Sequence, residues 1–193
     1  MGKIILASAS PRRQELLHQI GLEFDVVPSM SEERIDTTLS AEEVVKQLSF
    51  IKASDVANRV DPDRLVIGAD TIVVFQHRIL GKPKDRNDAV HMLKMLSGRE
   101  HRVLTGFTVM HIGQHKVISD YEETFVKFME LSDEEIDSYI NTGEPFDKAG
   151  AYGIQRYGSL LVEKIVGDYF NVVGLPVAKL ARVLKSEFGV RIL

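Results

Sequence analysis

The stretch Arg64-Leu-Val-Ile-Gly-Ala-Asp-Thr-Ile-Val-Val-Phe75 contains two apolar runs on either side of one aspartate, Asp70. Short apolar runs rich in β-branched residues are typical of strands that are buried on both faces. We therefore predict strands over residues 64–69 and 71–75. Asp70 falls between the two, at the end of a buried strand.

The carboxylate of Asp70 has two interpretations. Strand ends in α/β folds commonly carry ligand sites, and there Asp70 could bind a divalent ion or take a proton from an attacking water. Gly68 and Ala69 would let a ligand approach the backbone closely. The alternative is a turn aspartate that caps local N–H groups, and one aspartate alone does not decide between the two.

Helix and strand patterns alternate on both sides of this stretch. Ser40-Ala-Glu-Glu43 and Ser132-Asp-Glu-Glu135 are capping boxes, in which serine and glutamate satisfy backbone N–H groups at the start of a helix. The patterns predict further strands over residues 3–7, 24–28, 102–112, 116–129 and 160–165. They predict helices over residues 11–20, 40–58, 85–96 and 176–188, and another that begins at residue 132. Loops are predicted over residues 29–39 and 143–158.

The apolar spacing within these helices also predicts which side chains face the core. They are Val44, Leu48 and Ile51; Ala89, Met92, Leu93 and Leu96; Ile136, Tyr139 and Ile140; and Val177, Leu180, Ala181, Leu184 and Phe188. Alternating elements followed by paired strands predict a mixed α/β fold, with a long twisted sheet and flanking helices. Because no repeat, linker or boundary divides residues 1–193, we expect a single domain.

The composition excludes several kinds of site. The chain has 193 residues, no cysteine and a net charge of −4. It can therefore hold no thiolate zinc site, iron–sulfur cluster or cysteine nucleophile, and it suits a reducing cytoplasm. Without a basic surplus it is not expected to bind duplex nucleic acid, and no apolar run approaches the ~20 residues that span a bilayer. We expect a cytoplasmic protein whose anionic ligand is small.

The segment Ser8-Ala-Ser-Pro-Arg-Arg13 has features of an anion site. A small-residue loop before a helix exposes backbone N–H groups, and the helix dipole favours an anion there. The Ser8 hydroxyl and the Arg12 and Arg13 guanidinium groups add donors suited to phosphate. Two arginines in a first turn are unfavourable by themselves, which calls for a compensating anion. An N-cap at Ser10 followed by two solvated arginines is the alternative.

Three further residues could contact a nucleotide. Lys82 is presented by the stiff loop Gly81-Lys-Pro83 and could meet a phosphate. Lys52 follows a core-facing position of its helix, and Gln155 has both a donor and an acceptor with which to recognise a base edge. Solvated lysines and a structural turn are the alternatives. The histidines lack metal-ligand spacing, and no G-x-S-x-G elbow surrounds a serine.

Together these segments resemble the Maf family of nucleotide pyrophosphatases over nearly the whole chain. The likeness is carried by Leu6–Arg13, Gly68–Thr71, Gly81–Pro83, Met92–Gly98, Asp147–Gln155 and Val173–Pro176. It implies a fold like that of the inosine triphosphate pyrophosphatases, with the site in a cleft between two lobes, and often a homodimer. It also implies that water attacks the α-phosphate of a nucleoside triphosphate and that pyrophosphate leaves, with Mg²⁺ or Mn²⁺ present.

The resemblance also implies roles for individual residues. Asp70 would be the general base and, with Glu33, a metal ligand. The phosphates and metal would be surrounded by Ser8, Arg12, Arg13, Glu33, Lys52 and Lys82, and base choice would be set by Arg12, Thr71 and Gln155.

The motifs Gly68-Ala-Asp-Thr71 and Tyr152-Gly-Ile-Gln155 are similar to the branch of the family that acts on dTTP and UTP, in a house-cleaning role that could extend to modified pyrimidine nucleotides. Arg156 stands where members of the family usually have glycine, which puts the shape of the base pocket in question. Two alternatives stay open. One is a nucleotide-binding regulator linked to septum formation, and the other is a metal-independent serine hydrolase that uses Ser8 or Ser10.

Overall fold

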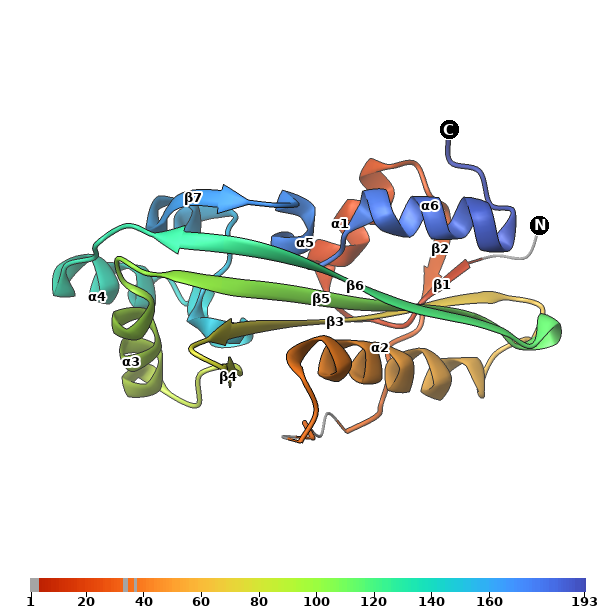
Figure 1. Cartoon of the computed structure of the whole chain (residues 1–193), viewed down its shortest axis with the longest axis horizontal. Helices are drawn as coiled ribbons and strands as arrows, with labels where there is room; N and C mark the ends of the chain where they lie inside the picture. Colours follow the sequence, from red (N-terminus) through yellow and green to blue (C-terminus); the bar gives the residue numbers. More distant parts are fainter. Residues whose placement is uncertain (1–3, 33–34, 37) are drawn as a thin grey trace. The chain divides into compact units, whose positions relative to one another are not determined.

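The computed structural model describes residues 4–32, 35–36 and 38–193 (Figure 1). The chain forms two compact units. Unit 1 consists of Met1–Asp70, Thr105–Glu122 and Gly174–Leu193, and unit 2 of Thr71–Leu104 and Glu123–Val173. The expectation of a single domain over residues 1–193 stays a prediction.

The described residues form one mixed sheet with helices, which confirms the predicted α/β class. The strand order is β2-β1-β3-β5-β6-β7, and β4 pairs with β3. Strand β1 is parallel to β2 and β3, whereas β3–β4 and β6–β7 are antiparallel. The strands are β1 (Ile4–Leu6), β2 (Phe24–Val26), β3 (Leu65–Phe75), β4 (Arg78–Leu80), β5 (Glu100–His111), β6 (Lys116–Phe128) and β7 (Val162–Val166). The α-helices are α1 (Pro11–Gln19), α2 (Ala41–Ala57), α3 (Arg86–Leu96), α4 (Asp133–Asn141), α5 (Tyr169–Val173) and α6 (Val177–Phe188).

In unit 1, helix α2 packs against strand β3 by direct backbone contact. The predicted capping box at Ser40 starts the helix. A Cβ atom added at Gly68 would overlap the Ser49 carbonyl oxygen and lie 2.7 Å from the Ala53 nitrogen. Glycine is therefore needed at this position because the backbone of α2 occupies the space above it. The expectation that Gly68 leaves room for a ligand is wrong for the same reason.

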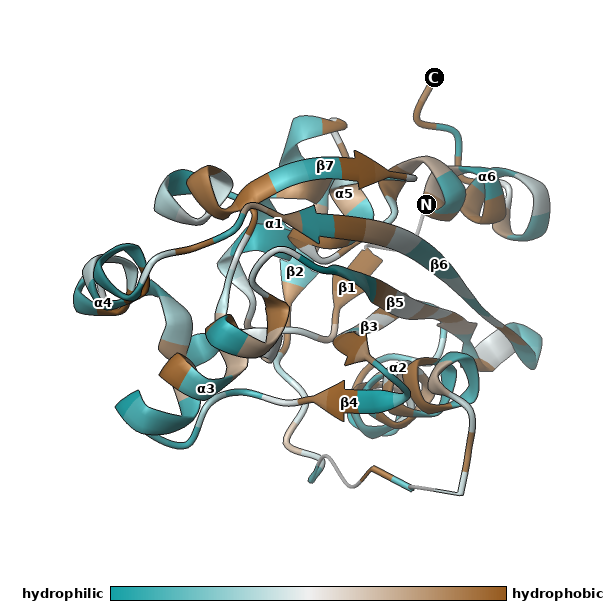
Figure 2. Ribbon diagram, turned by 60° about the vertical axis from the view of Figure 1, so that its left-hand side comes forward, coloured by the Kyte–Doolittle hydropathy of each residue, from teal (hydrophilic) through white to brown (hydrophobic). Residues whose placement is uncertain are grey.

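Strand β3 runs without interruption from Leu65 to Phe75. The prediction of two strands with Asp70 at an end is therefore wrong, since Asp70 lies inside one strand. The β-branched residues after Asp70 continue the strand, and the carboxylate has a partner from α2, so no turn is needed to satisfy it. Figure 2 shows hydrophobic colouring at the arrowhead end of β3.

In unit 2, helices α3 and α4 contact each other (Figure 1) and share a core with the ends of the strands. The capping box at Ser132 is present, and Asp85 caps α3. All seven predicted core residues of these two helices are buried: Ala89, Met92, Leu93, Leu96, Ile136, Tyr139 and Ile140. In the other helices, Ile51, Ala181 and Phe188 are only partly buried, so the predicted apolar faces of α2 and α6 are too wide.

Two segments of unit 2 differ from their predictions. The short helix α5 was not predicted, because five residues are too few to show a helical period. The segment predicted as a glycine-rich loop over 143–158 contains 3₁₀ turns at Glu144–Asp147 and Ala149–Ala151 and the start of a third, Arg156–Leu161. Short 3₁₀ turns are common connectors and need no helical repeat in the sequence.

Candidate functional site

Ser8 and Arg13 form a buried hydrogen-bonded pair at the start of α1. Each has 8% of its surface exposed. The Arg13 Nη1 donates to Ser8 Oγ (3.1 Å), and Arg13 Nε donates to the Gly174 carbonyl oxygen (2.8 Å). The backbone N–H of Ser10 also donates to Ser8 Oγ (3.2 Å). The guanidinium group is thus held in one orientation, which excludes the interpretation of Arg13 as a solvated arginine.

Helix α1 begins as predicted, with Ser10 at the N-cap and Pro11 in the first turn. Among the described residues, however, the Ser10 side chain forms no capping hydrogen bond. Arg12, in the same first turn, is half-buried. The positive end of the α1 dipole and two guanidinium groups therefore lie together at the first turn, an arrangement that suits an anion.

Lys52 and Asp70 form a largely buried ion pair. Lys52 Nζ lies 2.5 Å from Asp70 Oδ1, and the two side chains are 13% and 10% exposed. Removing both charges from water costs several kcal/mol per ion, so a buried pair is weak evidence for a stabilising role. Because a carboxylate can take a proton from an attacking water and a neighbouring cation can orient it, Asp70 and Lys52 are the strongest catalytic candidates among the described residues of unit 1.

The local packing explains how this pair forms. Side chains alternate along a strand, so Asp70 lies on the same face of β3 as Gly68. The backbone of α2 lies over Gly68 at Ser49 and Ala53. Lys52 is one residue before Ala53 and one helical turn after Ser49, so its ammonium group reaches Asp70.

A chain of hydroxyl groups supports α2 within unit 1. Ser49 Oγ donates to the Lys46 carbonyl oxygen (2.9 Å) and also lies 2.9 Å from Thr108 Oγ1. Thr108 Oγ1 lies 2.8 Å from Ser119 Oγ. Since the Ser49 proton is used by the carbonyl, Ser49 accepts from Thr108, which in turn accepts from Ser119. Sequence reasoning missed these residues, because small polar residues in a helix (Ser49) or in strands (Thr108 and Ser119) carry no signal of a long-range partner.

Asp55, one turn after Lys52, anchors the loop that follows β2. Its Oδ2 accepts hydrogen bonds from the Met30 backbone N–H (2.7 Å), Ser29 Oγ (2.9 Å) and Arg59 Nη2 (2.9 Å). The Met30 N–H contributes most to holding the pKa of the Asp55 carboxyl below its usual value. Asp55 was also missed from the sequence. The predicted metal ligand Glu33 lies outside the described residues.

In unit 2, a backbone hydrogen bond links the segments that carry Lys82 and Gln155. The Gly150 N–H donates to the Gly81 carbonyl oxygen (3.0 Å). Lys82 is exposed, and Gln155 is half-buried. Thr71, the remaining predicted residue of this unit, is also half-buried.

The segment before Gln155 is anchored by two tyrosines. Tyr152 OH lies 2.7 Å from His101 Nε2, and both rings pack edge-on against Phe128. Burial lowers the pKa of His101 to about 4 and raises that of Tyr152. The Gly153 backbone N–H donates to Tyr139 OH (3.2 Å), and burial is the main cause that raises the pKa of Tyr139 to about 12.

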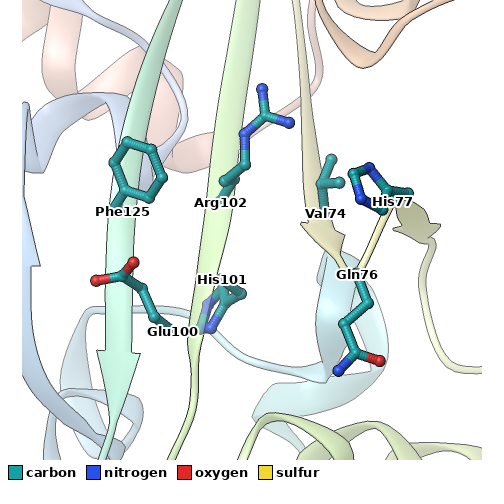
Figure 3. Close-up of a pocket in the computed structure, with 7 residues that line it drawn as sticks. All are labelled: Val74, Gln76, His77, Glu100, His101, Arg102 and Phe125. Carbon is teal, nitrogen blue, oxygen red and sulfur yellow. The ribbon is translucent and has the colours of Figure 1, made fainter.

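A separate pocket of about 240 Å³ lies in unit 2 (Figure 3). It is lined by the β3–β4 turn, Gln76 and His77, and by side chains of β5 and β6 that include Arg102 and Phe125. Arg102 forms an ion pair with Glu123. None of the predicted site residues lines this pocket, so it is not the predicted site.

The described part of the chain contains no cluster of three or more histidine, aspartate or glutamate side chains that could hold a metal ion by itself. Within the same residues, no helix is long and apolar enough to cross a membrane. Asp70 offers a carboxylate oxygen, the type of ligand that Mg²⁺ prefers. Mg²⁺ is usually bound by one or two carboxylates together with substrate phosphates and water, so a single described carboxylate fits such a site.

Comparison with known proteins gives the following similarities. A family model described as "Maf-like protein" matches residues 3–187. A protein of Alkaliphilus oremlandii named "dTTP/UTP pyrophosphatase" is 58% identical over 193 residues, which cover 100% of both chains. One of Clostridioides difficile with the same name is 49% identical and covers 98% of this chain and 97% of its own. The structure of a HAM1 protein from Coxiella burnetii is 16% identical, with a TM-score of 0.49, over 96% of this chain and 99% of that one.

Proposed function

Because the chain belongs to the family of Maf-like proteins, we propose that it is a nucleoside triphosphate pyrophosphatase that hydrolyses dTTP and UTP to the monophosphate and pyrophosphate. The observation that carries this proposal is the full-length identity of 58% to a relative with that name. The buried pair of Lys52 and Asp70 supports it, because it supplies a carboxylate and a cation at one place.

In this proposal, Asp70 acts as the general base. Its carboxylate takes a proton from the water that attacks the α-phosphorus, the bond from that phosphorus to the bridging oxygen breaks, and pyrophosphate leaves. The proton then passes from Asp70 to solvent. Lys52 orients the Asp70 carboxylate and adds positive charge near the reacting phosphate. Charge stabilisation by fixed donors is usually the largest single contribution to such a reaction.

The other predicted residues bind the substrate. Ser8, Arg12, Arg13 and Lys82 contact the phosphates. The buried hydrogen bonds of Arg13 support this role, since they fix its guanidinium group before substrate arrives. Arg12, Thr71 and Gln155 select the base, and Gln155 can pair with a pyrimidine edge through its donor and its acceptor.

Mg²⁺ or Mn²⁺ is the proposed cofactor. When bound, the ion neutralises phosphate charge and polarises the phosphoryl oxygens. Asp70 would hold it together with Glu33. We further propose that the enzyme works in the cytoplasm, removes unwanted nucleotides, among them modified pyrimidine nucleotides, and forms a homodimer.

The test is hydrolysis by the purified protein. Incubation with dTTP and Mn²⁺ should release dTMP and pyrophosphate, separated by chromatography, and EDTA should stop the reaction. Asp70→Asn should lower turnover by on the order of a hundredfold or more and leave the fold intact by circular dichroism. Asp133→Asn is the matched control, since this exposed carboxylate lies on α4 and should leave turnover unchanged.

Other outcomes would favour the alternatives. Binding of dTTP without turnover would favour the nucleotide-binding regulator. Turnover that resists EDTA and leaves a covalent adduct on Ser8 or Ser10 would favour the serine hydrolase. Pyrophosphate release by Asp70→Asn at the wild-type rate would end the assignment of Asp70 as the base.

A further inference from the structure

The segment on both sides of Gln155 has an unusual backbone. Gly150, Ala151 and Arg156 all have positive φ angles, of 69°, 61° and 50°. Ala151 is fully buried. A residue other than glycine rarely adopts a positive φ, and this backbone conformation persists only where the surrounding contacts enforce it. The contacts that enforce it here are therefore of functional interest.

The Tyr139 hydroxyl lies where two parts of this segment meet. It accepts the hydrogen bond of the Gly153 backbone N–H at 3.2 Å. A Cβ atom at Gly158 would lie 2.9 Å from the same hydroxyl and would overlap the Gly153 carbonyl oxygen. The residues before and after Gln155 thus converge on one side-chain oxygen.

Tyr139 is also a rigid anchor. It lies on α4, whose start is fixed by the capping box at Ser132 and whose inner face buries Ile136 and Ile140. Tyr139 itself is 4% exposed. A hydroxyl that is held on the buried face of a helix restrains the segment more firmly than an exposed contact would.

We propose that Tyr139 is a positioning residue for base selection: its hydroxyl holds the Gly153 N–H and so sets the place from which Gln155 recognises the base. This inference rests on the proposed function, in which Gln155 contacts the pyrimidine. Tyr139 does not touch the substrate and acts through the backbone two residues before Gln155.

The second anchor makes the role of Tyr139 separable. Tyr152 is held by His101 at 2.7 Å, and this bond does not involve Tyr139. Tyr139→Phe keeps the ring in the core and removes only the hydroxyl. The segment then stays attached through Tyr152 but loses the restraint at Gly153.

The experiment compares kcat/KM for dTTP, UTP and CTP between the wild type and Tyr139→Phe, with thermal melting of each protein. Tyr139→Phe should lower the preference for dTTP over CTP by about tenfold, because the segment loses the one hydrogen bond that orients it at Gly153. Tyr157→Phe is the matched control, because it removes the hydroxyl of a tyrosine that is 61% exposed in the same region. It should leave the preference unchanged.

A second variant reaches the same point from the other side. Gly158→Ala keeps the Tyr139 side chain intact, but the added Cβ would overlap the Gly153 carbonyl oxygen and lie 2.9 Å from the Tyr139 hydroxyl. It therefore separates Gly153 from that hydroxyl and should lower the preference in the same way. If both variants melt at a lower temperature but keep the wild-type ratio of dTTP to CTP, Tyr139 is merely structural and the inference is overturned.

Gln155→Ala separates this inference from the proposed function. If Gln155→Ala changes the ratio and Tyr139→Phe does not, only the positioning role fails. If neither changes the ratio, Gln155 does not select the base and the positioning role fails with it. If the wild type does not hydrolyse dTTP at all, the proposed function itself is wrong.

Discussion

Replacement of Gly68 by alanine tests the contact that brings Lys52 to Asp70. The added Cβ would overlap the Ser49 carbonyl oxygen and lie 2.7 Å from the Ala53 nitrogen and 2.9 Å from the Ala53 Cβ. Ordinary contacts of a Cβ atom begin at 3.4 Å. Two of the three neighbours are backbone atoms of α2, which cannot rotate away, so the helix must shift as a whole.

This geometry sets the expected loss of stability in Gly68→Ala. Overpacking a core costs about 1–3 kcal/mol, and the backbone contacts put Gly68→Ala near the upper value. For a chain of this size, 1 kcal/mol corresponds to roughly 2–4 °C in Tm, so we expect Tm to fall by about 6–12 °C. Because Ser49 and Ala53 flank Lys52, the shift also lengthens the contact with Asp70, and turnover should fall at temperatures where the variant is fully folded.

Differential scanning calorimetry and pyrophosphate release measure the two effects. Gly81→Ala is the control for stability, since no atom lies within 4 Å of its added Cβ, and its Tm should not fall. Gly106→Ala pushes α2 at Val45 instead, nearly two turns before Lys52, so it should destabilise the protein with a smaller loss of turnover. A Tm of Gly68→Ala within a degree or two of wild type would refute the tight contact between α2 and β3.

Two further predictions concern unit 2. Burial lowers the pKa of His101 from 6.5 to about 4. Between these two pH values the unfolded chain binds a proton that the folded chain does not. The stability that neutral His101 contributes is therefore full above pH 6.5 and falls by up to about 3 kcal/mol as the pH drops from 6.5 through 4. Unfolding by urea between pH 7 and pH 4 should show this loss, whereas His101→Gln should show a shallower dependence; equal slopes would mean that other groups cause it. Arg156 has a φ of 50°, a conformation that costs a residue with a side chain about 1 kcal/mol. Arg156→Gly should therefore raise Tm by about 2–4 °C. A lower Tm would show that the Arg156 side chain makes contacts that outweigh the strain.

The sequence predicts those elements whose signals are local. Both capping boxes and the core faces of α3 and α4 follow from spacings of three and four residues, and the structure confirms them. The prediction fails at Asp70 because a lone carboxylate in an apolar run resembles a strand end. Its partner Lys52 lies 18 residues away in the sequence, and no local pattern reveals a partner at that separation.

Helix α5 shows the same limit. The buried Asn171 side chain on this helix donates to the Val103 carbonyl oxygen and to Thr124 Oγ1, each at 3.0 Å. These long-range hydrogen bonds fix the segment, whereas its five residues contain too little apolar spacing to predict it. Tyr139 was predicted correctly as a core residue, but its ring alone accounts for that prediction, and the role of its hydroxyl emerges only from the packing of Gly153 and Gly158.

The motif Gly68-Ala-Asp-Thr71 therefore combines two separate requirements. Gly68 is needed because the backbone of α2 comes within contact distance of β3, and Asp70 is needed at the next position on the same face because Lys52 is delivered there by that contact. A larger residue at Gly68 would move the cation away from an unchanged carboxylate, and a neutral residue at Asp70 would leave the ammonium group buried without its counter-charge. The two residues thus depend on each other through a helix that neither belongs to, which explains why the motif is informative as a unit although each residue alone is a weak signal.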